Sequence, residues 1–190
     1  GGDERGSLSV SHQQDLPICI PIASQFLHAT GVAFAIQYRS QSRAVLATGG
    51  DAATSKGDFY EAINVAGAWN LPVVFVINNN QWGISVPTSK QTSCQTLAQK
   101  GIAAGIDCVQ VDGNDVVAVT DVVHQALEKA RANKGATLIE ALTYRLCDHT
   151  TADDSSRYRE DKEVEAAWEL EPIIRLRQYL ADNHLWSEND

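Results

Sequence analysis

The sequence predicts a single α/β domain in which a doubly wound parallel sheet is flanked by helices. Apolar runs rich in Val, Ile and Ala alternate along the chain with segments whose apolar residues recur at helical spacing. The runs are apolar on both faces, which is typical of parallel strands covered by helices. A length of 190 residues with 44% hydrophobic residues suffices for one sizeable core. Successive strand–helix–strand units imply right-handed crossovers.

The first part of the chain leads into this domain. Residues 1–15 are polar and show no periodic apolar pattern, so we expect a loop there. Residues 16–22 form an apolar run, but Pro17 and Pro21 are incompatible with a central strand. This run is therefore expected to be an extended segment held against another part of the domain.

A helix is expected next, with Ser24 as its N-cap. Its small apolar face is predicted to contain Leu27, Thr30, Gly31, Ala33 and Phe34. His28 lies in this helix, and we expect it to be packed and hydrogen-bonded, as a lone histidine on an apolar helix usually is.

Two apolar runs predict neighbouring strands that are joined by a helix. The first strand covers residues 43–48 and is ended by Gly49 and Gly50, and the second covers residues 72–77. Asp58 or Ser55 is expected to cap the helix between them. The apolar residues of that helix recur at helical spacing, at Phe59, Ala62, Ile63, Ala66 and Trp69.

Further signals complete the alternation. They predict a polar turn over residues 78–88, a short helix over 96–104, strands over 106–111 and 137–144, a turn and helix cap over 112–115, and an amphipathic helix over 116–132. Residues 145–158 form a polar loop too rich in His, Asp and Arg to be only a connector. Charged helices, split near Pro172, are expected over residues 160–185 and place residues 160–190 at the end of the single domain, 1–190.

The charge of the chain disfavours some classes of binding partner. With 24 acidic and 15 basic residues, the formal net charge is -9. This charge disfavours a broad electrostatic interaction with nucleic acid or with an anionic membrane. A small anionic ligand stays compatible, because backbone amides and a metal ion supply a positive field locally.

The sequence also carries signals about location. No apolar run approaches the roughly 20 residues of a membrane span, and the first residues lack the basic and apolar regions of a signal peptide. We therefore expect a cytoplasmic protein. The cysteines lack zinc-ligand spacing, which favours buried, reduced thiols over disulfides. They are Cys19, Cys94, Cys108 and Cys147.

The chemistry is expected at the polar turns that follow the first two strands. Neighbouring parallel strands end at the same edge of a sheet, so Asp51 and Asn80 should emerge together, where open α/β sheets bind ligands. Carboxylate and amide oxygens suit Mg²⁺, which also holds phosphate oxygens. Gly49 and Gly50 allow a diphosphate to approach closely, and the following helix N-terminus favours anions. Either turn alone is more often structural, but other phosphate-binding motifs are absent from the sequence.

The spacing of the two turns resembles that of a known family. Gly50-Asp51-Ala52 is separated from Asn79-Asn80 by residues 53–78, which is similar to the Gly-Asp-Gly and Asn-Asn motifs of thiamine diphosphate enzymes. The surrounding sequence resembles the α subunit of bacterial 2-oxoacid dehydrogenase E1 components, especially the pyruvate type. Residues 149–159 are similar to the active-site loop of that family, and the likeness covers residues 3–186. The resemblance implies the diphosphate-type domain of the thiamine diphosphate-binding fold.

Residue by residue, the resemblance implies a cofactor site for thiamine diphosphate and Mg²⁺. Asp51 and Asn80 correspond to side-chain ligands of Mg²⁺, and the backbone carbonyl of Trp82 corresponds to a third ligand. Ile20 and Ile22 match backbone positions that contact the aminopyrimidine, although the family's Gly-x-Val-Gly is replaced here by residues 20–23. The positions against the diphosphate are Gly50, Ala52 and Ala53.

The resemblance also assigns roles within the loop of residues 145–159. His149 matches a histidine that reaches the diphosphate and the reacting centre, where an imidazole assists proton transfer or reductive acylation of the lipoyl group. The alternative for His149 is a solvated loop histidine. The residues that resemble those ordering the loop when cofactor binds are Asp153, Arg157, Tyr158 and Arg159.

Two departures from the family pattern matter for binding. Ala52 replaces the second glycine of the motif, so weaker binding is expected if its methyl group crowds a diphosphate oxygen or if the turn demands a dihedral less open to alanine. The second departure is length, because the family's α subunits carry a long segment before the position where this sequence starts, and that segment includes a Tyr-Arg pair that helps to bind the cofactor. In the family, a glutamate of the β subunit also activates the aminopyrimidine, and no residue of this chain is assigned that role. We therefore expect that this chain does not decarboxylate 2-oxo acids by itself.

The resemblance implies an enzyme that oxidatively decarboxylates pyruvate and acylates lipoyl groups, with an E1 β subunit and a lipoyl-bearing E2 as partners. One alternative keeps the cofactor and changes the substrate to branched-chain 2-oxo acids or acetoin. Another alternative is an N-terminally truncated, catalytically silent fold unit that self-associates as a homo-oligomer through exposed apolar surface.

Overall fold

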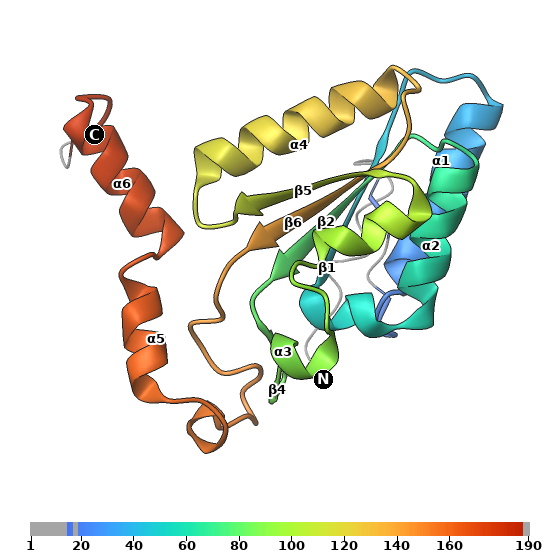
Figure 1. Cartoon of the computed structure of the whole chain (residues 1–190). Helices are drawn as coiled ribbons and strands as arrows, with labels where there is room; N and C mark the ends of the chain where they lie inside the picture. The colour runs from blue at the N-terminus through green and yellow to red at the C-terminus, as the bar shows by residue number, and fades with distance from the viewer. Residues whose placement is uncertain (1–14, 17–18, 188–190) are drawn as a thin grey trace.

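The computed structural model describes residues 15–16 and 19–187. Within them, four strands form one parallel sheet with the order β1-β2-β6-β5. The strands are β1 (Val45–Gly50), β2 (Val73–Asn79), β5 (Asp107–Asp112) and β6 (Thr137–Leu142). Helices α1 (Ser24–Tyr38) and α2 (Gly57–Ala68) cover one face of the sheet, and α4 (Val116–Arg131) covers the other (Figure 1). The predicted α/β fold with a parallel sheet flanked by helices is confirmed.

Strand β2 shows how one apolar run serves both faces of the sheet. Its side chains alternate between the faces. Val73, Phe75 and Ile77 belong to the buried cluster shared with α1 and α2, whereas Val74 belongs to the cluster shared with α4. A strand buried in this way must be apolar at nearly every position, as the sequence is here.

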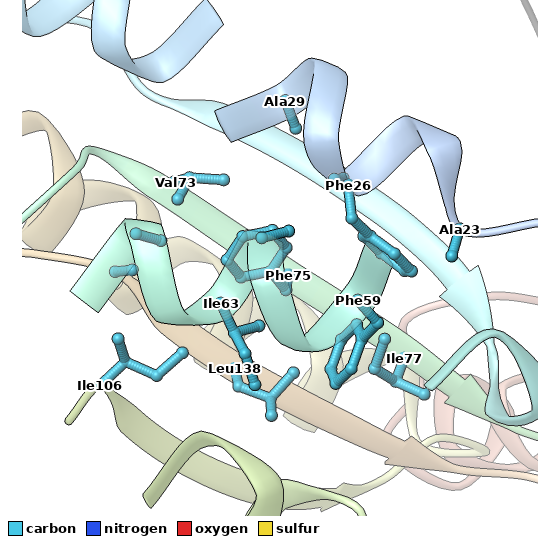
Figure 2. Close-up of a cluster of buried hydrophobic side chains, with 14 of the residues drawn as sticks. Ala23, Phe26, Ala29, Phe59, Ile63, Val73, Phe75, Ile77, Ile106 and Leu138 are labelled. Atoms are coloured by element: carbon cyan, nitrogen blue, oxygen red, sulfur yellow. The ribbon is translucent and has the colours of Figure 1, made fainter. Parts of the chain in front are cut away.

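Aromatic rings join the two helices to the sheet. Figure 2 shows Phe26 of α1 beside Phe59 of α2 and Phe75 of β2. The ring centroid of Phe26 lies 5.2 Å from that of Phe59 and 5.9 Å from that of Phe75, and both pairs meet edge to face. All three side chains are fully buried. This packing fixes the helices against the strand whose end carries Asn79 and Asn80.

The first strand differs from its prediction. It begins at Val45 and runs through Gly49 and Gly50, because these glycines pair with residues of β2. β1 is also the edge of the described sheet, and Leu46 is 47% exposed. The expectation that this strand is covered on both faces is therefore wrong for the described residues. The other strands begin or end within two residues of their predicted bounds.

The helix caps were harder to predict. Ala23, in the left-handed region with φ 72°, takes the N-cap position of α1, and Ser24 is the first helical residue. A 3-10 helix, η2 (Asp51–Ser55), precedes α2, so that Lys56 takes its N-cap position instead of Ser55 or Asp58. Both predicted caps are wrong. The predicted cap of α4 is confirmed, because the carboxylate of Asp115 accepts hydrogen bonds from two backbone amides of that helix.

The buried face of α1 is rotated from the predicted one. Its buried residues are Phe26, Ala29, Thr30, Ala33 and Ile36. Leu27 and Phe34 are more than one third exposed, and His28 is exposed, so its prediction as a packed residue is wrong. In α2 the predicted apolar residues are buried as far as Ala66, but Trp69 is 56% exposed beyond the end of the helix.

The remaining elements surround the sheet. They are β3 (Trp82–Gly83), β4 (Val86–Pro87), α3 (Thr88–Gln91), η3 (Ala98–Ala104), η4 (Ser155–Arg157), α5 (Asp161–Trp168) and α6 (Pro172–Asp182). β3 and β4 pair as a small antiparallel hairpin inside the predicted polar turn. The predicted split of the last helices at Pro172 is confirmed, and α6 is tied to the end of β5 by an ion pair of 2.8 Å between Arg175 and Asp112.

Other predictions concern single segments. In the apolar run of residues 16–22, Leu16, Ile20 and Ile22 are exposed and belong to no strand, and Pro17 lies outside the described residues. The loop predicted over residues 1–15 also lies outside them, except for Asp15. Of the helices in the described part of the chain, none has the length and apolar character needed to cross a membrane.

The thiols are free, as predicted, but their burial differs from the prediction. Cys19 and Cys108 are half-buried, whereas Cys94 and Cys147 are exposed. Desolvation, together with the neighbouring Asp107 carboxylate, raises the pKa of the Cys108 thiol. The expectation of buried thiols is therefore wrong for the two exposed cysteines.

Candidate functional site

The two polar turns leave the same edge of the sheet. β1 pairs with β2 in parallel, with Gly50 opposite Asn78, so Asp51 and Asn80 follow neighbouring strand ends. A cavity of about 1310 Å³ opens at this edge and extends along β1 and α1. All nine residues predicted from the sequence line it: Ile20, Ile22, Gly50, Asp51, Ala52, Ala53, Asn80, Trp82 and His149. The fold thus brings together residues as far apart in the chain as Ile20 and His149.

The carboxylate of Asp51 is buried at the wall of this cavity. The residue is 2% exposed, and its Oδ2 atom accepts hydrogen bonds from Gln91 Nε2 at 3.0 Å and from Thr88 Oγ1 at 3.3 Å. Both donors are neutral and lie on α3. Among the described residues, no ion pair involves Asp51. A buried carboxylate without a paired cation favours a cationic ligand, because burying an uncompensated charge is costly.

Asn80 and Trp82 present oxygen atoms from the second turn. Asn80 Oδ1 accepts a hydrogen bond from the Trp82 amide at 3.0 Å, which closes the turn around Gln81, a residue with φ 71°. The Trp82 carbonyl accepts a hydrogen bond from Arg145 Nη1 at 3.5 Å. The described residues hold no group of three or more His, Cys, Asp or Glu side chains that would bind a metal. A metal here would depend on one carboxylate, one amide and one carbonyl.

Asn79, which precedes Asn80, stabilises the turn from within the protein. Asn79 is buried, and its Nδ2 donates to Glu140 Oε1 at 2.7 Å, whereas its Oδ1 accepts from the Gln81 amide at 3.1 Å. The other carboxylate oxygen of Glu140 accepts the Ala98 amide at 3.0 Å. Sequence reasoning missed this support, although Glu140 is the only charged residue in the apolar run of β6. It also missed Thr88 and Gln91, whose polar side chains carry no distinguishing pattern.

Gly50 leaves space that the protein itself does not use. Its φ of -83° and ψ of 167° are open to any residue, and a Cβ built there would meet no atom within 4 Å. By contrast, a Cβ at Gly49 would lie 2.4 Å from the Phe26 ring. Packing therefore requires glycine at position 49 but not at 50. A ligand that approaches the backbone would account for Gly50.

Ala52 is compatible with the local backbone. It lies in η2 and is not among the described residues with positive φ, so the dihedral objection raised from the sequence is wrong. Its methyl group is exposed and borders the cavity beside Gly83, where a Cβ would come within 2.8 Å of it. The remaining effect of alanine at this position is therefore the space that the methyl group takes.

The loop that carries His149 is held by its own side chains. His149 is exposed and lines the cavity, and its amide donates to Asp153 Oδ2 at 2.8 Å. The same oxygen accepts the Tyr158 hydroxyl at 2.5 Å, and that hydroxyl accepts Arg145 Nη2 at 2.6 Å. The hydrogen bonds from Tyr158 and from the His149 amide hold the pKa of Asp153 below its ordinary value. Desolvation and the bond to Asp153 raise the pKa of Tyr158.

Two arginines of this loop differ in burial. The guanidinium of Arg159 is buried and donates to the carbonyls of Arg145 and Cys147. Arg157 is exposed. Arg159 thus joins the contacts that organise the loop, and whether these contacts change when cofactor binds stays a prediction.

His28 was not predicted as a site residue, yet it lines the same cavity from α1. Its exposure explains this placement, because the buried face of α1 is turned toward Phe59 and Phe75. Ile20 and Ile22 border the cavity as well and are 78% and 60% exposed.

Comparison with known proteins identifies similar chains. The family model described as "Dehydrogenase E1 component" matches residues 1–190. The chain is 46% identical over 187 residues to the 3-methyl-2-oxobutanoate dehydrogenase subunit alpha of Mycobacterium tuberculosis, covering 98% of this chain and 51% of the relative. It is 47% identical over 172 residues to the pyruvate dehydrogenase E1 component subunit alpha of Staphylococcus aureus, covering 90% and 46%. The subunit of that name in Acholeplasma laidlawii is 44% identical over 190 residues, covering 100% and 55%. The chain thus spans about half the length of these relatives.

Proposed function

This chain belongs to the dehydrogenase E1 component family, and on that premise we propose that it binds the diphosphate of thiamine diphosphate together with Mg²⁺. The observation that carries the proposal is the buried Asp51 carboxylate, which has neutral hydrogen-bond donors, no described cation partner and a cavity beside it. A divalent cation that bridges this carboxylate and an anionic diphosphate would compensate both charges.

The residues present fit such a group. Asp51, the Asn80 amide oxygen and the Trp82 carbonyl offer hard oxygen ligands for Mg²⁺. Gly50 leaves room for a diphosphate, since neither its dihedral angles nor its neighbours require glycine. Ala52 and Ala53 lie in the wall beside it, and Ile20 and Ile22 offer apolar surface for the thiamine rings.

The chemistry of the reaction belongs to the cofactor, which when bound stabilises the carbanion left by decarboxylation of a 2-oxo acid. This chain would bind and orient it. His149 is the residue proposed to move a proton, because its exposed imidazole lies at the cavity on a loop that Asp153 holds by the His149 amide. Arg145 and Tyr158 would keep that loop in place.

We propose pyruvate as the substrate of the complete enzyme, with transfer of the acyl group to lipoyl carriers. Two of the relatives above are named for pyruvate, but the relative named for 3-methyl-2-oxobutanoate is equally similar. Branched-chain 2-oxo acids are therefore the second candidate, and acetoin is a third. An E1 β subunit and a lipoyl-bearing E2 are the proposed partners, and the cytoplasm is the proposed location.

A silent, self-associating unit is the alternative from another class. Exposed aromatic residues near the ends of α1 and α2 favour it: Phe34, Tyr38 and Trp69 are 45%, 81% and 56% exposed, and the Phe34 ring lies near the rings of the other two. Calorimetric titration with thiamine diphosphate, with and without Mg²⁺, distinguishes the cofactor-binding hypothesis from the hypothesis of a silent unit. Binding that requires Mg²⁺ supports the cofactor site, and no binding at millimolar cofactor contradicts it.

A further inference from the structure

A buried lysine lies behind the turn that carries Asp51. Lys100 of η3 is only 5% exposed. Its Nζ donates hydrogen bonds to the carbonyl and to the Oγ1 atom of Thr54, each at 2.9 Å. Lysine side chains are rarely buried without a specific partner, so this placement requires an explanation.

The surroundings of this ammonium do not include a paired carboxylate. None of the ion pairs between described residues involves Lys100. The Tyr60 ring, with its centroid 5.3 Å from Nζ, gives partial compensation through a cation–π contact. The nearby Glu140 instead accepts hydrogen bonds from Asn79 and Ala98. Within the described residues, Lys100 therefore has no direct ion-pair partner, and its ammonium contacts the Thr54 oxygens and the Tyr60 ring instead.

Thr54 connects this lysine to the candidate site. Its hydroxyl donates to the Asp51 carbonyl at 2.7 Å, and the residue is fully buried. The turn of η2 has two sides, because Asp51, Ala52 and Ala53 line the cavity whereas Thr54 faces Lys100. Lys100 therefore supports the turn that forms the cavity wall, and it does so from the side opposite the cavity.

We propose that Lys100 is a positioning residue of the cofactor site, which acts through Thr54 on the Asp51 turn and favours an anionic diphosphate by its buried charge. The inference rests on the proposed function. A charge behind the turn acts through a short, water-excluded path, so it is screened little by salt.

A purely structural role predicts a different result. In that case, replacing Lys100 would lower the melting temperature but leave the affinity of the folded protein unchanged. The two roles are separated by measuring both quantities on the same variants. The probe is inorganic pyrophosphate in the presence of Mg²⁺, titrated by calorimetry into the full chain, with thiamine diphosphate as a second titrant.

Lys100→Met removes the charge and the donors at similar length, and Lys100→Arg keeps both. We expect Lys100→Met to weaken pyrophosphate binding about tenfold, a loss of about 1.4 kcal/mol of binding free energy, and Lys100→Arg to restore most of the affinity. Lys134→Met is the matched control, since Lys134 is an exposed lysine before β6 and its loss should leave binding unchanged.

Thr54→Val keeps the lysine and removes the hydroxyl link, so it tests the proposal if Lys100→Met does not fold. We expect it to weaken Mg²⁺-dependent binding several-fold. Wild-type affinity in folded Lys100→Met, or in Thr54→Val, would overturn the proposal while leaving the proposed function intact. If the wild-type chain binds neither pyrophosphate nor thiamine diphosphate, the proposed function fails, and the inference fails with it.

Discussion

Arg145 donates a hydrogen bond to the main-chain carbonyl of Trp82 at 3.5 Å. This carbonyl is the proposed third ligand of Mg²⁺, so a protein cation already touches the turn that would hold the metal. The same guanidinium bonds the Tyr158 hydroxyl at 2.6 Å. Arg145 therefore links the cofactor turn to the loop that carries His149.

Removing this link should loosen the loop. We expect Arg145→Ala to increase amide hydrogen exchange across residues 145–159, because Tyr158 and Trp82 lose their shared partner. Arg131→Ala removes an exposed arginine that pairs with Glu128, three positions before it in α4, and serves as the control. Equal exchange in the loop of Arg145→Ala and Arg131→Ala would contradict this account.

The loop should also respond to acid. Because the pKa of Asp153 is held below its ordinary value of 3.8, its stabilising contacts are present above that pH and are lost as the pH falls through the lower folded-state pKa. We expect protection of the His149 amide to decrease on acidification in that range. Asp153→Asn should weaken protection at neutral pH and remove this pH dependence. Exchange of the His149 amide, followed by NMR, measures both effects.

Neighbouring glycines should tolerate alanine differently. Gly50→Ala should change the free energy of unfolding by less than about 1 kcal/mol, because its dihedrals suit any residue and its Cβ meets open space. The added methyl group should nevertheless weaken thiamine diphosphate binding, because it enters the proposed diphosphate space. Gly49→Ala should instead destabilise the fold, since its Cβ would lie 2.4 Å from Phe26. Urea unfolding and calorimetry test the pair, and unchanged cofactor affinity of Gly50→Ala would exclude this placement of the diphosphate.

Phe26 should be the main anchor of α1. We expect Phe26→Ala to lower the free energy of unfolding by about 3–5 kcal/mol, because its buried ring meets Phe59 and Phe75 edge to face. Phe34→Ala on the same helix is the control and should cost far less, since Phe34 is 45% exposed. Similar losses in urea unfolding for the two variants would contradict this assignment of the core.

The sequence predicted the parts of the fold that depend on hydrophobic patterning. The parallel arrangement of β1 and β2 and the common edge for Asp51 and Asn80 followed from two apolar runs with a helix between them. The caps of α1 and α2 did not follow, because Ala23 reaches the N-cap position by a left-handed backbone and η2 displaces the start of α2. Local capping residues cannot reveal either effect.

The residues that hydrogen-bond to the two turns of the site could not be predicted from the sequence. Lys100, Glu140 and Gln91 reach the two turns only through the tertiary fold, from positions 40 or more residues away from their partners. His28 was misassigned because helical spacing alone did not show which face Phe26 would turn inward. Ala52 was judged by its residue type, whereas its backbone in η2 suits alanine.

The charge of Asp51 is the centre of the proposed function. Asp51→Asn keeps an oxygen acceptor for Gln91 and Thr88 but removes the charge that would hold Mg²⁺. Asp121→Asn, at an exposed position of α4, is the matched control. In calorimetric titration with thiamine diphosphate and Mg²⁺, we predict Mg²⁺-dependent binding by the wild type and by Asp121→Asn, and its loss in Asp51→Asn. Binding of equal affinity and equal Mg²⁺ dependence in Asp51→Asn would contradict the assignment of this site.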